Sequence, residues 1–164
     1  MATMTHQETF DKGVQLRLAG NEAFKTGDYK EALTKYYHAI LHLRTVGGNQ
    51  HKDEFKDDAN KQLLMIYNNM ATVLSKQNKW ERVLDYSKKA RELDENNVKA
   101  KFRMGQAYLR LGAIDKAKPL LQSVLDNDPE DALVKHEMEI LKQEEKKMES
   151  REKTVYRNMI SKMA

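Results

Sequence analysis

A segment of 13 residues occurs twice along the chain, and this repetition constrains the fold more than any other feature of the sequence. The stretch from Gly20 to Ala32 (GNEAFKTGDYKEA) aligns with the stretch from Gly105 to Ala117 (GQAYLRLGAIDKA) and, more weakly, with residues 71–83. Each copy has a small residue, then a turn, a large apolar residue just past the turn and another small residue three positions later. Short helices repeated in this way stack as antiparallel pairs, because the small residues let the two helices of a pair cross closely.

Helical periodicity extends over most of the chain. Apolar residues recur at three- and four-residue spacing, as in Leu33, Tyr36, Ile40 and Leu43, and no comparable stretch alternates with a period of two. Turn residues interrupt this pattern and predict helices over residues 8–26, 29–45, 54–77, 80–93, 97–111, 114–127 and 130–163. With only 7 Gly, 2 Pro and no Cys, the composition argues against an all-β fold, a disulfide framework and a thiolate metal site.

The repeated segment resembles the tetratricopeptide repeat, a helix-turn-helix unit of about 34 residues. Placing Gly20 at the eighth place of the unit starts the copies near residues 13, 64 and 98, so the first step is 51 residues long and the second is 34. We expect the charge-rich insert near 47–63 to lengthen a loop and the front of the third helix. The resemblance implies an all-α, right-handed superhelix of three repeats (six antiparallel helices) over 13–130, with Trp80 buried between the second and third pairs. An N-terminal extension (1–12) precedes the repeats, and a long C-terminal capping helix (131–164) follows them.

Five polar residues fall on the helices that would line the concave groove of such a stack: Arg17, Asn21, Asn69, Lys99 and Arg103. Arg17 and Asn21 are four residues apart, as are Lys99 and Arg103, so each pair shares one helix face. Three cations and two amides converging on a groove would hold a chain terminus that ends in a carboxylate next to an Asp side chain.

These five positions coincide with the carboxylate clamp of tetratricopeptide co-chaperones. The resemblance implies that the groove binds the C-terminal Glu-Glu-Val-Asp tail of heat-shock protein 90 or of cytosolic heat-shock protein 70. Arg17 stands where that family usually has Lys, so a planar guanidinium replaces a point charge. A generic peptide-binding scaffold without chaperone specificity is the alternative interpretation of the same groove.

Three further segments indicate a narrower family within the tetratricopeptide co-chaperones. The stretch Trp80–Lys89, the insert before Tyr67-Asn68-Asn69 and the stretch Glu152–Ile160 resemble the tetratricopeptide-repeat protein 9 family, with the large immunophilins as the next relatives. About a dozen residues precede the repeats, so we expect no prolyl-isomerase domain ahead of them. The resemblance therefore implies a stand-alone co-chaperone-like adaptor.

Other classes of function have little support in the sequence. The chain has no phosphate-binding loop and no nucleophile elbow, and its acids are interleaved with Lys, so we expect neither an enzyme nor a cofactor. His38 and His42 have metal-ligand spacing but no evident third ligand, so no metal site is expected. A formal net charge of +4 does not by itself imply a nucleic-acid partner. The apolar runs are too short to cross a bilayer, which makes the cytoplasm the default compartment.

The C-terminal helix has an amphipathic end. Val155, Met159 and Met163 recur at four-residue spacing beside Tyr156 and Ile160, with basic residues around them. This pattern is typical of a partner helix that calmodulin could bind through residues 151–163. The alternative is a structural cap on the repeat stack, and we expect residues 151–163 to pack at least partly onto the repeats, because an apolar stripe is costly to leave in water.

Overall fold

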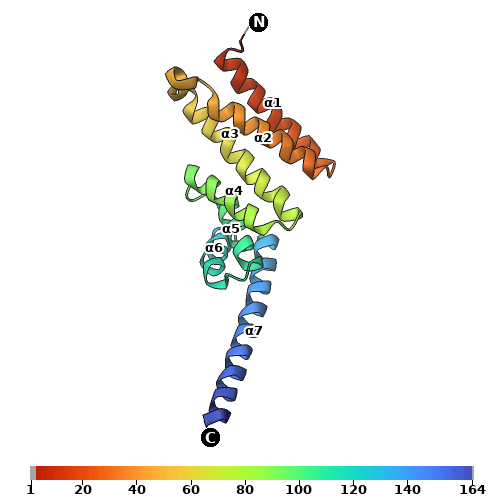
Figure 1. The fold of residues 1–164 in the computed structure, drawn as a ribbon, viewed down its shortest axis with the longest axis vertical. Helices are drawn as coiled ribbons and strands as arrows, with labels where there is room; N and C mark the ends of the chain where they lie inside the picture. The colour runs from red at the N-terminus through yellow and green to blue at the C-terminus, as the bar shows by residue number, and fades with distance from the viewer. Residues whose placement is uncertain (1–2, 164) are drawn as a thin grey trace.

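The computed structural model describes residues 3–163, and within this range it contains helices and no strands. The seven helices are α1 (His6–Lys25), α2 (Tyr29–Thr45), α3 (Gly48–Lys76), α4 (Trp80–Leu93), α5 (Val98–Arg110), α6 (Ile114–Asn127) and α7 (Ala132–Met163). The first six form the consecutive pairs α1–α2, α3–α4 and α5–α6, and α7 extends away from the last pair (Figure 1). The all-α prediction of three helix pairs and a seventh helix is confirmed.

The turn inside each helix pair contains a residue with left-handed backbone geometry. These residues are Gly27 (φ 82°), Asn78 (φ 59°) and Gly112 (φ 83°). Glycine adopts this geometry without steric cost, and Asn is one of the few other residues that tolerate it. The spacing of the three residues along the chain reproduces the steps of 51 and 34 residues between the repeats. Equivalent turns therefore close the three pairs.

Small residues lie where the helices of a pair cross, as the repeat alignment predicts. A Cβ atom on Gly20 would lie 2.5 Å from Cε1 of Tyr36, and one on Gly105 would lie 2.9 Å from the side chain of Leu121. Ala71 takes the equivalent place in the second pair and is completely buried. The close crossing in the first pair puts the ring of Tyr36 directly beneath α1.

The apolar core has two parts. One cluster runs through α1 to α5, and a second joins α5 and α6 to Val134 and Leu141 of α7. Trp80 packs against the first cluster and has the guanidinium carbon of Arg110 at 5.4 Å from its ring centroid. Trp80 thus lies between the second and third pairs as predicted, but it is partly and not completely buried. The reason is that an arginine, and not an apolar side chain, covers the ring.

The insert forms helix and not loop, contrary to part of the expectation. α3 is continuous from Gly48 over 29 residues, so only Val46 and Gly47 separate it from α2. The added turns of α3 contact the start of α1, where the rings of His6 and His51 are 5.0 Å apart and those of Phe10 and Phe55 are 6.1 Å apart. α1 itself begins at His6, where the side chain of the N-cap Thr5 accepts a hydrogen bond from the backbone N–H of Glu8.

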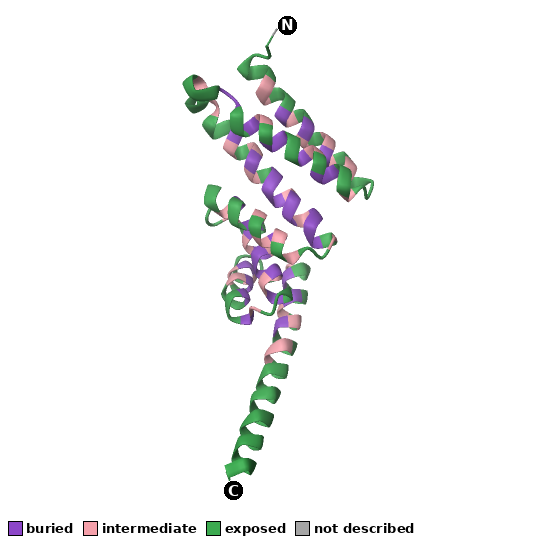
Figure 2. Ribbon diagram, viewed as in Figure 1, coloured by how far each residue is buried: buried purple, intermediate pink, exposed green. Residues whose placement is uncertain are grey.

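The end of α7 does not pack onto the repeats, so the expectation for residues 151–163 is wrong. Val134, Glu137 and Leu141 are buried, but every residue from 146 to 163 is exposed (Figure 2). α7 contacts α6 and α5 through its first turns and then continues straight past them (Figure 1). Nothing turns the helix back toward the stack. Across residues 3–163, no helix is both long and apolar enough to span a membrane.

Candidate functional site

Asn21 and Asn69 form a hydrogen-bonded pair between α1 and α3. Oδ1 of Asn21 accepts one hydrogen bond from the Tyr36 hydroxyl at 2.6 Å and another from Nδ2 of Asn69 at 3.0 Å. Because both bonds go to the oxygen, the orientation of the Asn21 amide is fixed, and its two N–H donors face away from Tyr36. Burial raises the pKa of the Tyr36 hydroxyl, although the neighbouring Asn69 side chain and the charge of Arg17 act in the opposite direction. The hydroxyl therefore stays neutral and keeps donating.

Arg17 is held in place by the insert helix. Its Nε donates to Oε1 of Gln62 at 2.7 Å, and this bond joins α1 to α3 across 45 residues of sequence. The guanidinium has five N–H donors, so this single bond leaves its Nη groups able to bind an anion. Gln62 therefore fixes the direction of Arg17, one of the five predicted site residues.

Two neighbouring hollows lie along α1, α3 and α5. One has a volume of about 560 Å³, and the side chains that line it include Arg17, Asn69, Lys99 and Asp94. The other, of about 690 Å³, is lined by Asn21, Asn69 and Tyr36 together with apolar residues of α1. Asn69 lines both hollows and so marks the place where they meet. Four of the five predicted residues therefore border the same groove.

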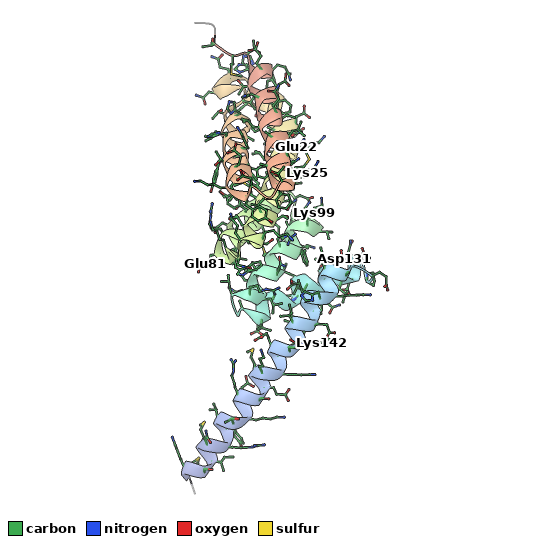
Figure 3. The ribbon with its side chains drawn as sticks, turned by 90° about the vertical axis from the view of Figure 1, so that its right-hand side faces the viewer. Glu22, Lys25, Glu81, Lys99, Asp131 and Lys142 are labelled. Carbon is green, nitrogen blue, oxygen red and sulfur yellow. The ribbon has the colours of Figure 1, made fainter. Side chains whose placement is uncertain are left out.

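The groove lies on one side of the helix stack. Figure 3 shows Glu22 and Lys25 of α1 on the same side as Lys99 of α5, while Glu81 of α4 lies on the opposite side. Glu22 and Lys25 also line the larger hollow and form an ion pair with each other at 3.2 Å. The Lys99 side chain is exposed and, within residues 3–163, forms no ion pair. Lys99 thus supplies an accessible positive charge to the groove.

Arg103 lies beside the groove, at the contact between α3 and α5, and borders neither hollow. Its Nη1 donates to Oγ of Ser75 at 3.3 Å and to Oε1 of Gln106 at 3.0 Å. Burial lowers the pKa of Arg103, and the negative charge of Glu137 partly offsets this effect. Arginine titrates so far above neutrality that the side chain remains charged. Arg103 is therefore a half-buried cation whose direction is set by polar neighbours.

Three further side chains at or beside the groove could not be identified from sequence. Tyr36 has the spacing of a core residue, and that pattern does not reveal where its hydroxyl points. Gln62 lies in the insert, where the repeat alignment gives no register. Asp94 adds a carboxylate to the smaller hollow, next to Asn97, whose Nδ2 donates to it at 3.4 Å. Asp94 is the C-cap residue of α4, and the sequence marks it only as a turn residue that precedes the N-cap Asn97.

The histidine pair on α2 has a local role in the structure. Nδ1 of His42 lies 2.8 Å from the backbone oxygen of His38, one helical turn earlier. Within residues 3–163, no group of three or more His, Cys, Asp or Glu side chains has the arrangement of a metal site. The described residues therefore give the histidine pair no further metal ligands.

Comparison with known proteins agrees with the helix-pair architecture. Residues 74–136 match the sequence family described as tetratricopeptide repeat. The chain is 29% identical over 161 residues to peptidyl-prolyl cis-trans isomerase FKBP4 of Bos taurus and 28% identical to that of Homo sapiens. Both alignments cover 98% of this chain but 35% of the relative, so the chain spans about a third of the length of these relatives.

Solved structures show the same fold. The C-terminal tetratricopeptide-containing domain of a putative FK506-binding protein from Plasmodium falciparum has a TM-score of 0.82 at 23% identity, covering 90% of this chain and 97% of that one. The Hsp90 co-chaperone Cns1 from Saccharomyces cerevisiae has a TM-score of 0.74 at 18% identity, covering 94% of this chain and 46% of that one. The first such domain of Spaghetti (RPAP3), bound to the HSP90 peptide SRMEEVD, has a TM-score of 0.64 at 23% identity, covering 81% and 92%. This chain therefore has the tetratricopeptide-repeat fold and is related in sequence to FKBP4.

Proposed function

We propose that the groove binds the acidic C-terminal tail of heat-shock protein 90 or of cytosolic heat-shock protein 70, and that the protein acts as a co-chaperone-like adaptor. The observation that carries this proposal is the Asn21–Asn69 pair, which joins the two hollows and has Arg17 and Lys99 beside it. A similar fold in RPAP3 was solved with an HSP90 peptide bound, which supports the same use of the groove here.

Each side chain has a defined role in the proposed complex. The amide N–H donors of Asn21 and Asn69 bind the terminal carboxylate of the peptide, and Arg17, Lys99 and Arg103 counter its charge and that of the last Asp side chain. Charge-assisted hydrogen bonds contribute about 1.5–3 kcal/mol each, and ordering a flexible peptide offsets much of the sum. Micromolar affinity is the expected result.

The class of protein and its compartment are proposed from the resemblance to tetratricopeptide co-chaperones. The protein is proposed to be an adaptor and not an enzyme, to work without a cofactor and to reside in the cytoplasm. Its membership of the tetratricopeptide-repeat protein 9 family rests on the segments Trp80–Lys89 and Glu152–Ile160 and on the insert, and it stays a prediction.

The test compares two forms of one peptide. Met-Glu-Glu-Val-Asp with a free C-terminus should bind in fluorescence polarisation or calorimetry, and the C-terminally amidated twin should not. Lys99→Ala should weaken binding of the free acid at least about tenfold, because losing about 1.4 kcal/mol lowers an equilibrium constant by a factor of ten. Lys116→Ala is the control, since Lys116 lies on α6 against the ring of Tyr108 and not in the groove. Equal binding of both peptides would instead favour a generic peptide scaffold.

The end of α7 supports a second candidate function, binding of calmodulin through residues 151–163. The stripe of Val155, Tyr156, Met159, Ile160 and Met163 is 49–85% exposed, so a partner can reach it without moving any repeat. A pull-down on immobilised calmodulin in calcium and in chelator tests this function. Capture that is equal in both buffers, or absent from both, would rule out a calcium-dependent complex.

A further inference from the structure

A chain of hydrogen bonds connects the first turns of α7 to Arg103. Nη1 of Arg103 donates to Oε1 of Gln106 at 3.0 Å, and Nε2 of Gln106 donates to Oε1 of Glu137 at 3.0 Å. Arg110 donates to the same carboxylate through Nη1 at 2.6 Å and through Nη2 at 2.9 Å. Glu137 is only 2% exposed. The seventh helix thus places a buried carboxylate, hydrogen-bonded at both oxygens, against α5.

The position of Glu137 is fixed from two sides. Arg110 holds the carboxylate in a bidentate pair, while its guanidinium lies over the ring of Trp80. Val134 and Leu141, one turn before and one turn after Glu137, are buried in the core shared by α5, α6 and α7. A buried carboxylate is costly unless it is paired and hydrogen-bonded, so the arrangement has little freedom to shift.

The charge of Glu137 also decides which way the Gln106 amide points. An ionised carboxylate only accepts hydrogen bonds, so Gln106 must turn its NH₂ group toward Glu137. Its carbonyl oxygen then faces the guanidinium of Arg103, which only donates. If residue 137 could also donate, the Gln106 amide could flip and turn two N–H groups toward Arg103, and the bond between them would be lost.

We infer that Glu137 is a positioning residue for the peptide groove, which sets the orientation of Gln106 and thereby holds the Arg103 guanidinium beside α3. This inference rests on the proposed function, because it assigns a distant residue to the same groove. It also gives α7 a role in ligand binding besides covering the last helix pair. We call the hydrogen-bonded series Glu137–Gln106–Arg103 the relay. Removing either hydrogen bond of the Gln106 amide disconnects Glu137 of α7 from Arg103.

Simple electrostatics and positioning predict opposite results for the loss of this charge. Glu137 is an anion near a groove that would bind an anionic peptide, so neutralising it should strengthen binding if only long-range charge mattered. If Glu137 orients Arg103 through Gln106, neutralising it should weaken binding. The sign of the change therefore separates the two explanations.

The experiment measures the affinity of free-acid Met-Glu-Glu-Val-Asp for the whole chain and its variants by fluorescence polarisation. Glu137→Gln should weaken binding about three- to tenfold, the range expected when a hydrogen bond to a charged group is lost. In an Arg103→Ala background the same substitution should have no further effect, because the residue through which it acts is gone. Glu139→Gln is the matched control: it removes an acid from the same helix, but its side chain is exposed and lies 3.8 Å from Lys142.

A second variant keeps the experiment decisive if the loss of the Arg110–Glu137 pair destabilises the fold. Gln106→Met cuts the relay and leaves the Arg110–Glu137 pair intact, so it should weaken peptide binding to a similar extent with a smaller change in melting temperature. Nitrogen-15 relaxation of the Arg103 side chain gives a readout that needs no peptide. The guanidinium should become more mobile in both relay variants and not in Glu139→Gln.

The outcomes distinguish this inference from the proposed function. If the wild-type chain binds neither form of the peptide, both are overturned. If Lys99→Ala abolishes binding while Arg103→Ala, Glu137→Gln and Gln106→Met bind like wild type, the groove function stands and the positioning role is overturned. Tighter binding by Glu137→Gln, or equal weakening in the Arg103→Ala background, also overturns the positioning role.

Discussion

Removing one hydroxyl group should test how the first helix pair supports the groove. In Tyr36→Phe, Oδ1 of Asn21 loses its 2.6 Å hydrogen bond from the phenol and keeps the 3.0 Å bond from Asn69. The ring stays in place, because it is 1% exposed and packs beneath Gly20. The substitution therefore changes the hydrogen bonding of Asn21 without changing the packing of the core.

The size of the effect follows from these contacts. A neutral hydrogen bond between protein groups contributes about 0.5–1.5 kcal/mol, and the remaining bond from Asn69 keeps the Asn21 oxygen from being left unpaired. We expect a loss of about 1 kcal/mol in the free energy of unfolding, which lowers the melting temperature of a chain of this size by about 2–4 °C. With one of its two restraints gone, the Asn21 amide should bind the peptide about two- to fivefold more weakly.

Tyr37→Phe is a closely matched control, because it makes the same change at the next residue of the same helix. The Tyr37 hydroxyl accepts a hydrogen bond from Tyr86 at 2.8 Å and also contacts Arg82, in an exposed network between α2 and α4 that water can replace. Thermal unfolding and peptide titration of both variants form the assay. The reasoning is refuted if Tyr36→Phe matches wild type in both measurements, or if Tyr37→Phe weakens peptide binding as much.

Three further results are expected. Gly112→Ala should lower stability by about 1–2 kcal/mol in urea titrations, because alanine is strained at a φ of 83°, while Gly112→Asn should cost less. Deleting residues 151–164 should leave the midpoint of Trp fluorescence unfolding unchanged, because residues 146–163 are exposed; a lower midpoint would show that the tail supports the repeats. Burial raises the pKa values of Tyr36, Tyr67 and Tyr86 above 10.0, so their contribution to the free energy of unfolding should be fully present below about pH 10 and be lost at higher pH. Absorbance and urea titrations between about pH 9 and 11.5 would measure this loss.

The repeat architecture could be predicted because it depends on local features that recur. Gly27 and Gly112 mark two of the three turns, and Asn78 is a known substitute for glycine in the left-handed region, so the alignment located every helix pair. Gly20 and Gly105 mark the close crossings in the same way. Each of these signals depends only on residues that are close in sequence or that lie in the adjacent helix.

The remaining features depend on contacts that periodicity does not encode. The insert becomes helix because its turns pack on the start of α1, where Phe55 lies near Phe10. The direction of Arg103 depends on Glu137, 34 residues later in the sequence, through an amide that could point either way. The apolar stripe at the end of α7 predicted packing onto the repeats. This packing does not form, because α7 is long and straight and carries the stripe away from them.

The long exposed end of α7 will affect how unfolding is observed. Within residues 146–163 the helix is surrounded by solvent and is supported by local ion pairs such as Glu149–Lys153 at 3.3 Å, with Glu144–Lys147 at 3.2 Å where this end begins. Such pairs contribute about 0.2–0.5 kcal/mol each, and most helical stability in proteins comes from tertiary packing, which this end lacks. The far-ultraviolet circular dichroism signal should therefore fall steadily on heating, well before the repeats unfold together. Trp80, packed between the second and third helix pairs, should keep a flat native baseline over the same temperatures and report the cooperative transition alone.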